Sequence, residues 1–196
     1  MRRLLLATNN PGKVREFRRL LDGVPFEVVT PGEIGISVEV EEGGETYAEN
    51  AGLKARAFAD AGGCMALADD SGIEVDALNG QPGVRSARYG GPGLDDAGRV
   101  EKLLEATRDV PDEDRAARFR AVVAVVGPGG RERLFEGVVE GRLLRAPRGG
   151  GGFGYDPIFE VEPGRSAAEL DPEEKDRVSH RGKAVRAAAE YLRGLG

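Results

Sequence analysis

The chain has 196 residues, of which 40% are hydrophobic and 32% are charged, and its formal net charge is −6. This composition is ordinary for a globular protein, and the length predicts one domain or two small lobes with a buried core. The negative charge excludes an overall attraction to nucleic acid or to an anionic membrane, and no apolar run approaches the ~20 residues of a membrane span. The single cysteine, Cys64, excludes a disulfide framework, and we expect it to be a small buried hydrophobe. The first apolar run is too short for a signal peptide, so we expect a cytoplasmic protein.

The first candidate site is a polar turn between a strand and a helix. Residues 4–7 are typical of a buried strand, and residues 13–21 place their apolar side chains on one helical face. The turn consists of Thr8, Asn9, Asn10, Pro11 and Gly12, and Lys13 follows it. Because the first N–H groups of a helix are unpaired and its dipole is positive there, this turn is typical of an anion site. A plain turn with an exposed lysine is the alternative.

An acidic loop and a capped helix come next. Residues 26–29 form a second short strand, and residues 33–45 form a loop whose glutamates are solvated, unless one of them reaches a metal. Thr46 and Glu49 form a capping box, which predicts a helix to about residue 61. Lys54 lies on an otherwise apolar stripe of that helix, so it either reaches the surface or points into a cleft.

Two adjacent carboxylates, Asp69 and Asp70, follow a short apolar run and precede Ser71 and Gly72. Like charges in a partly buried site raise each other's pKa, so such a pair indicates a bound cation, a basic partner or a general base. Adjacent strand residues point to opposite faces, and we favour Asp70, the residue nearer the expected turn, as the reactive one. A surface turn capped by an aspartate is the alternative.

The middle of the chain predicts a hairpin preceded by a helix. The expected elements are a tight turn at 78–83, a sheet edge or cleft wall at 84–89, a helix at 95–107, a buried strand at 117–126, a turn at 127–130 and a partner strand at 133–144.

A glycine run at residues 149–152 permits close approach of the backbone to a ligand. Phe153 follows it and is a reasonable platform for stacking a base, while a loop whose Phe153 and Tyr155 fill the core is the alternative. We expect a last short strand at 156–159.

The C-terminal part offers basic side chains. Residues 171–175 carry the signals of a short helix, and a final helix opens near residue 179. A lone histidine such as His180 is more often structural, but beside Lys175 and Arg181 it favours a donor cluster for a base edge or phosphates.

Enzymes of phosphoryl transfer typically use lysines to bind phosphates and a few carboxylates to bind Mg²⁺. The residues therefore predict a Mg²⁺-dependent enzyme that acts on a nucleotide-like phosphate ester.

Five ordered stretches resemble the inosine/xanthosine triphosphate pyrophosphatase family over nearly the whole chain. They are LLLATNNPGKVREF, EEGGETYAENAGLKARAFA, ALADDSGIEVDALNGQPGVRSARY, GGFGYDPIF and EEKDRVSHRGKA. The resemblance implies an α/β fold with a mixed, twisted central sheet, flanking helices and two lobes separated by an active-site cleft. It implies one domain over residues 1–196 without a separable second domain. It also implies a homodimer that hydrolyses the purine nucleoside triphosphates ITP, dITP and XTP to monophosphate and pyrophosphate with Mg²⁺, removing deaminated purines from the nucleotide pool.

The resemblance also assigns roles by motif. The phosphates would be held by Thr8, Asn9, Asn10, Pro11, Gly12, Lys13 and Lys54, and the nucleotide by Ser71, Phe153, Gly154, Tyr155, Asp156, Lys175, His180 and Arg181. Glu42 and Asp70 would bind the metal, with Glu41 the alternative to Glu42. Asp70 would be the base for the attacking water, with Lys13 and Lys54 neutralising the departing pyrophosphate.

Two other classes stay open. One is a pyrophosphatase with another base preference, since guanine also has a 6-oxo group. The other is a nucleotide-binding module without turnover, against which the two carboxylates argue.

Overall fold

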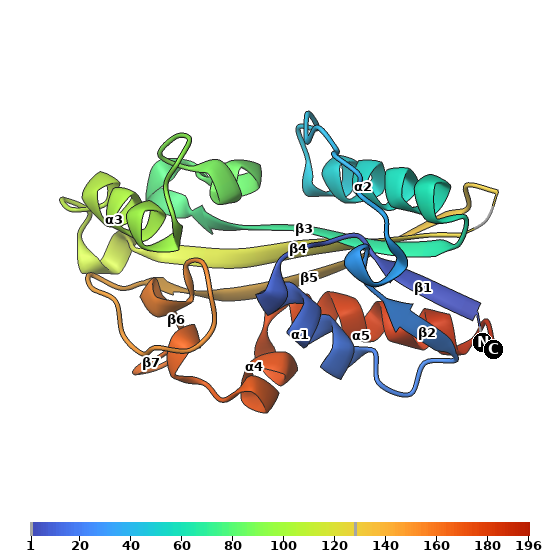
Figure 1. The fold of residues 1–196 in the computed structure, drawn as a ribbon. Helices are drawn as coiled ribbons and strands as arrows, with labels where there is room; N and C mark the ends of the chain where they lie inside the picture. The colour runs from blue at the N-terminus through green and yellow to red at the C-terminus, as the bar shows by residue number, and fades with distance from the viewer. Residues whose placement is uncertain (1, 128) are drawn as a thin grey trace. The chain divides into compact units, whose positions relative to one another are not determined.

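The computed structural model describes residues 2–127 and 129–196. Its seven-stranded sheet has the order β2-β1-β3-β4-β5-β6-β7 and is flanked by helices (Figure 1). The strands are β1 (Arg2–Leu6), β2 (Phe26–Val29), β3 (Met65–Val75), β4 (Ala116–Val126), β5 (Glu132–Leu143), β6 (Phe159–Glu162) and β7 (Arg165–Ser166). The α-helices are α1 (Pro11–Leu20), α2 (Tyr47–Gly62), α3 (Asp96–Ala106), α4 (Pro172–Val178) and α5 (His180–Arg193).

The sheet is mixed. β1 pairs in parallel with β2 and with β3, and β6 pairs antiparallel with β5 and β7. The parallel pairs follow from the connections, because α1 joins β1 to β2 and α2 joins β2 to β3, and parallel neighbours need such crossovers. The prediction of a mixed sheet with flanking helices is confirmed.

The chain divides into two compact units, and each has its own core. The first unit comprises the chain up to Asp70, residues 121–137 and residues 181–196, and the second comprises residues 71–120 and 138–180. A single domain with two lobes and a cleft stays a prediction.

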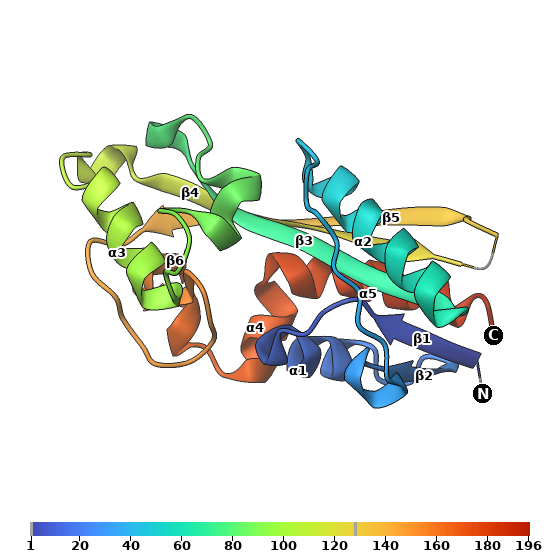
Figure 2. The same cartoon turned by 45° about the horizontal axis from the view of Figure 1, so that its top comes forward.

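The first unit has helices on both faces of its part of the sheet. α1 and α5 lie on one face and α2 lies on the other, as both ribbon views show (Figure 2). The core on the α1 and α5 side contains Phe17 of α1, Leu192 of α5, Leu6 of β1 and Leu67 of β3, all nearly inaccessible to solvent. Burial of such side chains contributes roughly 1.5–3 kcal/mol each, so this contact fixes the two helices on the sheet.

In the second unit, α3 packs against the C-terminal part of β3. Leu103 of α3 lies in one apolar cluster with Ile73 of β3, Phe119 of β4 and Phe159 of β6. The same cluster contains Tyr155 from residues 149–156, which we call the glycine-rich loop, so the loop is attached to the core of this unit.

The predicted strand at 26–29, the capped helix from Thr46 and the helix after Asp95 are confirmed. The turn alternative for the aspartate pair is wrong, because β3 continues from Met65 to Val75 through both aspartates. β3 has neighbours on both edges, β1 and β4, and this pairing overrides the local turn chemistry of Asp-Ser-Gly.

Four smaller expectations are also corrected. Gly83–Arg88 is a 3₁₀ helix instead of a sheet edge, and Asp156–Ile158 is another, so the strand expected there begins at Phe159 and β7 follows it. α4 extends to Val178, and Cys64 is half-buried instead of fully buried. At the hairpin turn the Gly127 N–H donates to the Arg131 carbonyl, and Pro128 lies outside the described residues.

In the part of the chain that the structure describes, the helices lack the length and apolar character needed to cross a bilayer.

Candidate functional site

The polar turn after β1 is organised by the cap of α1. Asn10 is the N-cap, and its side-chain oxygen accepts the N–H groups of Gly12 (2.8 Å) and Lys13 (3.1 Å). Thr8 accepts the N–H of Asn10 at 3.2 Å, and Pro11 occupies the first helical position, where no N–H is needed. Asn9 is exposed. The turn therefore fixes the start of α1 and places Lys13 in its first turn.

Lys13 belongs to a buried cluster of four charges. Its Nζ lies 2.9 Å from Oδ1 of Asp69, and Oδ2 of Asp69 accepts from Nε and Nη2 of Arg181, both at 3.1 Å. Nη1 of Arg181 donates to Glu16 at 2.7 Å. Burial alone would raise the pKa of Asp69, but the charges of Lys13 and Arg181 outweigh it and hold that pKa well below its usual range. The cluster carries two positive and two negative charges, so it is neutral as a whole.

Lys54 belongs to a second group on α2 and β3. Its Nζ lies 3.0 Å from Oε1 of Glu42 and 3.6 Å from Oδ1 of Asp70, and its side chain is only 12% exposed. Of the two alternatives for Lys54, the structure thus shows the inward orientation. Asn50 donates to Oδ2 of Asp70 at 3.1 Å, and its own oxygen accepts the N–H of Gly44, which ties the acidic loop to α2.

The two aspartates have opposite electrostatic environments. Burial raises the pKa of Asp70, and the nearby Lys54 and the Asn50 hydrogen bond offset that effect only in part. A raised pKa increases the affinity of a carboxylate for a proton, which suits a general base. Asp69, held by two cations, is a permanent counter-ion.

Glu42 and Asp70 are the oxygen donors that could hold a divalent cation. Among the described residues, no group of three or more His, Cys, Asp or Glu side chains is arranged to hold a metal. Two carboxylates still fit Mg²⁺, which is commonly held by one or two protein carboxylates together with substrate phosphates. Of the two glutamates weighed from the sequence, it is Glu42 that contacts the Lys54 ammonium beside Asp70.

In the second unit, the glycine-rich loop presents an aromatic ring beside a buried ion pair. Nζ of Lys175 donates to Oδ2 of Asp156 at 2.6 Å and lies 4.7 Å from the centre of the Phe153 ring. The same Asp156 oxygen accepts the Phe153 N–H at 2.9 Å. A Cβ on Gly152 would overlap that oxygen, so the close approach requires glycine. Lys175 therefore contacts the Phe153 ring, and Asp156 holds the Phe153 backbone N–H.

The remaining residues predicted to contact the nucleotide include two whose rings are buried in the second unit. The Tyr155 hydroxyl donates to the Ser86 carbonyl at 2.8 Å inside the core, which matches the core-filling alternative for this ring. His180 is buried and stacks on Phe119 with ring centres 4.7 Å apart. Ser71 follows Asp70 directly in β3.

The predicted donor cluster of three basic side chains is divided by its contacts. Lys175 binds Asp156, His180 stacks on an aromatic ring, and Arg181 binds Asp69 and Glu16. Glu16 and Asn50 were not among the residues predicted from the sequence. A helical signal existed for both, because Glu16 follows Lys13 by three positions and Lys54 follows Asn50 by four.

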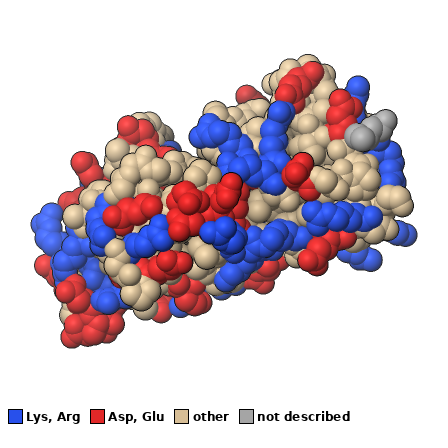
Figure 3. Space-filling model, turned by 90° about the horizontal axis from the view of Figure 1, so that it is seen from below, with Lys and Arg blue, Asp and Glu red and all other residues tan. Residues whose placement is uncertain are grey.

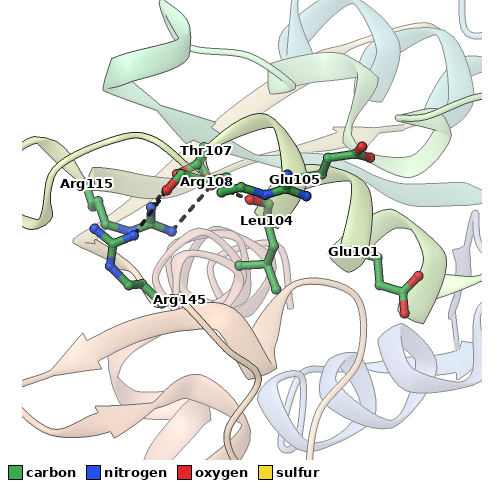
Figure 4. A pocket seen from close by; sticks show the side chains of 7 residues that line it. All are labelled: Glu101, Leu104, Glu105, Thr107, Arg108, Arg115 and Arg145. Atoms are coloured by element: carbon green, nitrogen blue, oxygen red, sulfur yellow. Dashed lines mark hydrogen bonds between the residues drawn. The ribbon is translucent and has the colours of Figure 1, made fainter.

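The second unit has a hollow of about 400 Å³ (Figure 4). It is lined by Glu101, Leu104, Glu105, Thr107, Arg108, Arg115 and Arg145. The Arg115 guanidinium donates hydrogen bonds to the backbone carbonyls of Thr107, Leu143 and Leu144, and so it stabilises the end of α3. None of the predicted site residues lines this hollow.

On the face shown in Figure 3, both basic and acidic side chains are exposed.

Comparison with known proteins identifies the family. Residues 4–191 match the model of the Ham1 family. A relative from Symbiobacterium thermophilum named dITP/XTP pyrophosphatase is 55% identical over 99% of this chain and 96% of its own length, and one of the same name from Bacillus subtilis is 45% identical over 98% of each. A solved structure of a HAM1 protein from Coxiella burnetii is 43% identical, covers 98% of both chains and has a TM-score of 0.88. The resemblance carried by the five motifs is confirmed, and the chain belongs to the Ham1 family.

Proposed function

We propose that this chain hydrolyses non-standard purine nucleoside triphosphates (ITP, dITP and XTP) to the nucleoside monophosphate and pyrophosphate, and so removes deaminated purines from the nucleotide pool. The observation that carries the proposal is the contact of one buried ammonium, that of Lys54, with both Glu42 and Asp70. The relatives named dITP/XTP pyrophosphatase support the substrate class.

Asp70 accepts a proton from the water that attacks the α-phosphorus. The water oxygen forms a bond to phosphorus, the bridging bond to the β-phosphate breaks, and its electron pair leaves with pyrophosphate. The raised pKa of Asp70 supports this role, because a base must hold the proton that it removes. Lys54 and Lys13 stabilise the negative charge that develops on the departing group.

Mg²⁺ is proposed as the cofactor, with Glu42 and Asp70 as its protein ligands. When bound, it would neutralise charge on the triphosphate and polarise the phosphorus. The positive end of the α1 dipole would attract a phosphate oxygen to the turn at residues 8–12, although Asn10 already accepts the N–H groups of Gly12 and Lys13.

The purine base is proposed to stack on Phe153 in the second unit. The proposed donor for a 6-oxo group is Arg181, His180 or an N–H group of the loop other than those of Gly151, Phe153 and Gly154, which donate to acceptors of the protein. Adenine presents an amino group at this position, so it would leave buried donors unpaired and would be rejected strongly.

The test is a turnover panel that measures pyrophosphate release from ITP, dITP, XTP, ATP and GTP, with and without Mg²⁺. We expect Mg²⁺-dependent turnover of the first three and at least a hundredfold lower kcat/KM for ATP. Equal rates for ATP would favour a pyrophosphatase of another base preference. Tight ITP binding without turnover would favour a binding module.

An Asp70→Asn variant that retains near-normal turnover would overturn the base assignment. A homodimer also belongs to the proposal, and light scattering on the purified chain tests it. The cytoplasmic location expected from the sequence stays a prediction.

A further inference from the structure

The glycine-rich loop of the second unit is tied down by its own backbone N–H groups. The Gly151 N–H donates to the Ala168 carbonyl at 3.0 Å, and the Phe153 N–H donates to buried Asp156. The next N–H group, that of Gly154, donates to Oδ2 of Asp96 at 2.8 Å. Two carboxylates therefore hold the consecutive amides on either side of the Phe153 Cα, and these bonds restrain the backbone that carries the ring.

Asp96 is 58 residues away from Gly154 in the chain and belongs to the first turn of α3. Its other oxygen, Oδ1, accepts from Nη1 of Arg99 at 3.1 Å, one helical turn further on. The carboxylate thus has a fixed orientation on a helix that is anchored in the core by Leu103. An ionised acceptor makes a shorter and stronger bond to an N–H group than a neutral one does.

We propose that Asp96 is a positioning residue, whose hydrogen bond to the Gly154 N–H holds Phe153 in the place where a purine base stacks. The inference rests on the proposed function for the identity of the ligand. The bond itself is a property of the loop and is measured without substrate.

Asp156 and Asp96 both hold the glycine-rich loop, but they differ in burial and in their other contacts. Asp156 is buried and also holds Lys175, so its loss disturbs the core of the site. The side chain of Asp96 is 55% exposed, and it contacts the loop through a single amide. A change at Asp96 therefore loosens the loop without emptying a buried position.

The test compares Asp96→Ala, which removes the acceptor, with Asp96→Asn, which keeps a neutral oxygen in its place. Both variants lose the same charge in the first turn of α3, so the difference between them reports the loss of the acceptor oxygens that serve the Gly154 N–H and Arg99. Glu101→Gln, an exposed charge change on the same helix, is the control.

The first readout is the Gly154 amide in the NMR spectrum of the labelled protein without ligand. In Asp96→Ala we expect an upfield shift of this proton and at least tenfold faster hydrogen exchange, with smaller changes in Asp96→Asn and none in Glu101→Gln. An unchanged Gly154 amide in Asp96→Ala overturns the proposal, whatever the protein does to nucleotides.

The second readout is steady-state hydrolysis of ITP. Loss of one hydrogen bond that only orders the platform corresponds to a KM increase of about three- to tenfold with kcat within about twofold, and Asp96→Asn should recover most of it. A loosened Gly154 with unchanged KM overturns the positioning role. A wild-type protein that releases no pyrophosphate from ITP refutes the proposed function instead. The NMR readout then still decides whether the hydrogen bond from the Gly154 N–H to Asp96 restrains the loop.

Discussion

Replacing Asp69 by asparagine should lower the free energy of unfolding, whereas the same replacement at Asp70 should not lower it. Asp69→Asn removes the charge that Lys13 and Arg181 share, and Asp70→Asn removes the charge beside Lys54. The two substitutions are chemically identical, they lie next to each other in β3, and both positions are buried. Any difference between them therefore reports the surroundings of the two carboxylates.

The magnitude follows from the contacts that are lost. Breaking a buried ion pair by removing one partner costs about 3–5 kcal/mol. We expect about 3 kcal/mol for Asp69→Asn, because Arg181 keeps its bond to Glu16 and the amide oxygen still accepts. Asp70 carries a raised pKa, so its ionised form is less stable in the folded protein than in the unfolded chain at neutral pH. Asp70→Asn removes this cost and should leave the protein as stable as the wild type or more stable.

The assay is urea unfolding followed by circular dichroism at pH 7 and at pH 3. The stabilisation from Asp69, whose pKa is lowered in the fold, is complete above its unfolded value near 3.8 and is lost as the pH falls through the folded value. The penalty from Asp70 appears as the pH rises from about 3.8 through its raised folded pKa, so its effect vanishes at pH 3. Glu105→Gln, which removes an exposed pair with Lys102, should change nothing measurable. An Asp69→Asn variant no less stable than Asp70→Asn at pH 7 would refute this electrostatic assignment.

Three further outcomes are expected. Lys54→Met should lower kcat/KM for ITP at least a hundredfold in a pyrophosphate-release assay, because the ammonium offsets charge on the leaving group, and a loss below tenfold would contradict that role. Gly152→Ala should lower the melting temperature and raise KM, since its Cβ would overlap a buried carboxylate oxygen at a positive φ, whereas Gly150→Ala has open space and should change neither. Glu42→Gln should raise the Mg²⁺ concentration for half-maximal activity at least tenfold, while Glu41→Gln should not, and equal shifts would remove Glu42 from the metal site.

Elements with local signals were predictable from the sequence. The helix from Tyr47 begins where the capping box of Thr46 and Glu49 places it, because every group in that motif lies within four residues. The sequence predicted that the strand would end near Asp69 and Asp70, because Asp-Ser-Gly favours a turn when it is considered alone. Pairing with β1 and β4 is a long-range effect that no local pattern contains, and it extends the strand through both aspartates.

The types of residue in the candidate site could be predicted from the sequence, but which of these residues contact one another mostly could not. The chemistry of lysines and carboxylates indicated Lys13, Lys54 and Asp70, and the structure brings Lys54 to Asp70. It could not indicate that Lys13 contacts Asp69, since that depends on which face of the strand each side chain takes. The bond from Asp96 to the loop joins residues 58 positions apart, and only the packing of α3 in the second unit brings them together.

The alternation of a β-strand explains why the two adjacent aspartates have different surroundings. α1 and α5 cover one face of β3 and α2 covers the other, so consecutive side chains reach different helices. Asp69 meets Lys13 of α1 and Arg181 of α5, and it is neutralised by them. Asp70 meets α2, where one ammonium is shared with Glu42, and it keeps a proton affinity that Asp69 has lost. A single aspartate could not be both a permanent counter-ion and a base, because the cations that fix its charge would also lower its pKa. If exchange of Asp69 for asparagine left the pH dependence of kcat unchanged while exchange of Asp70 abolished turnover, the two roles would be separated as the strand geometry requires.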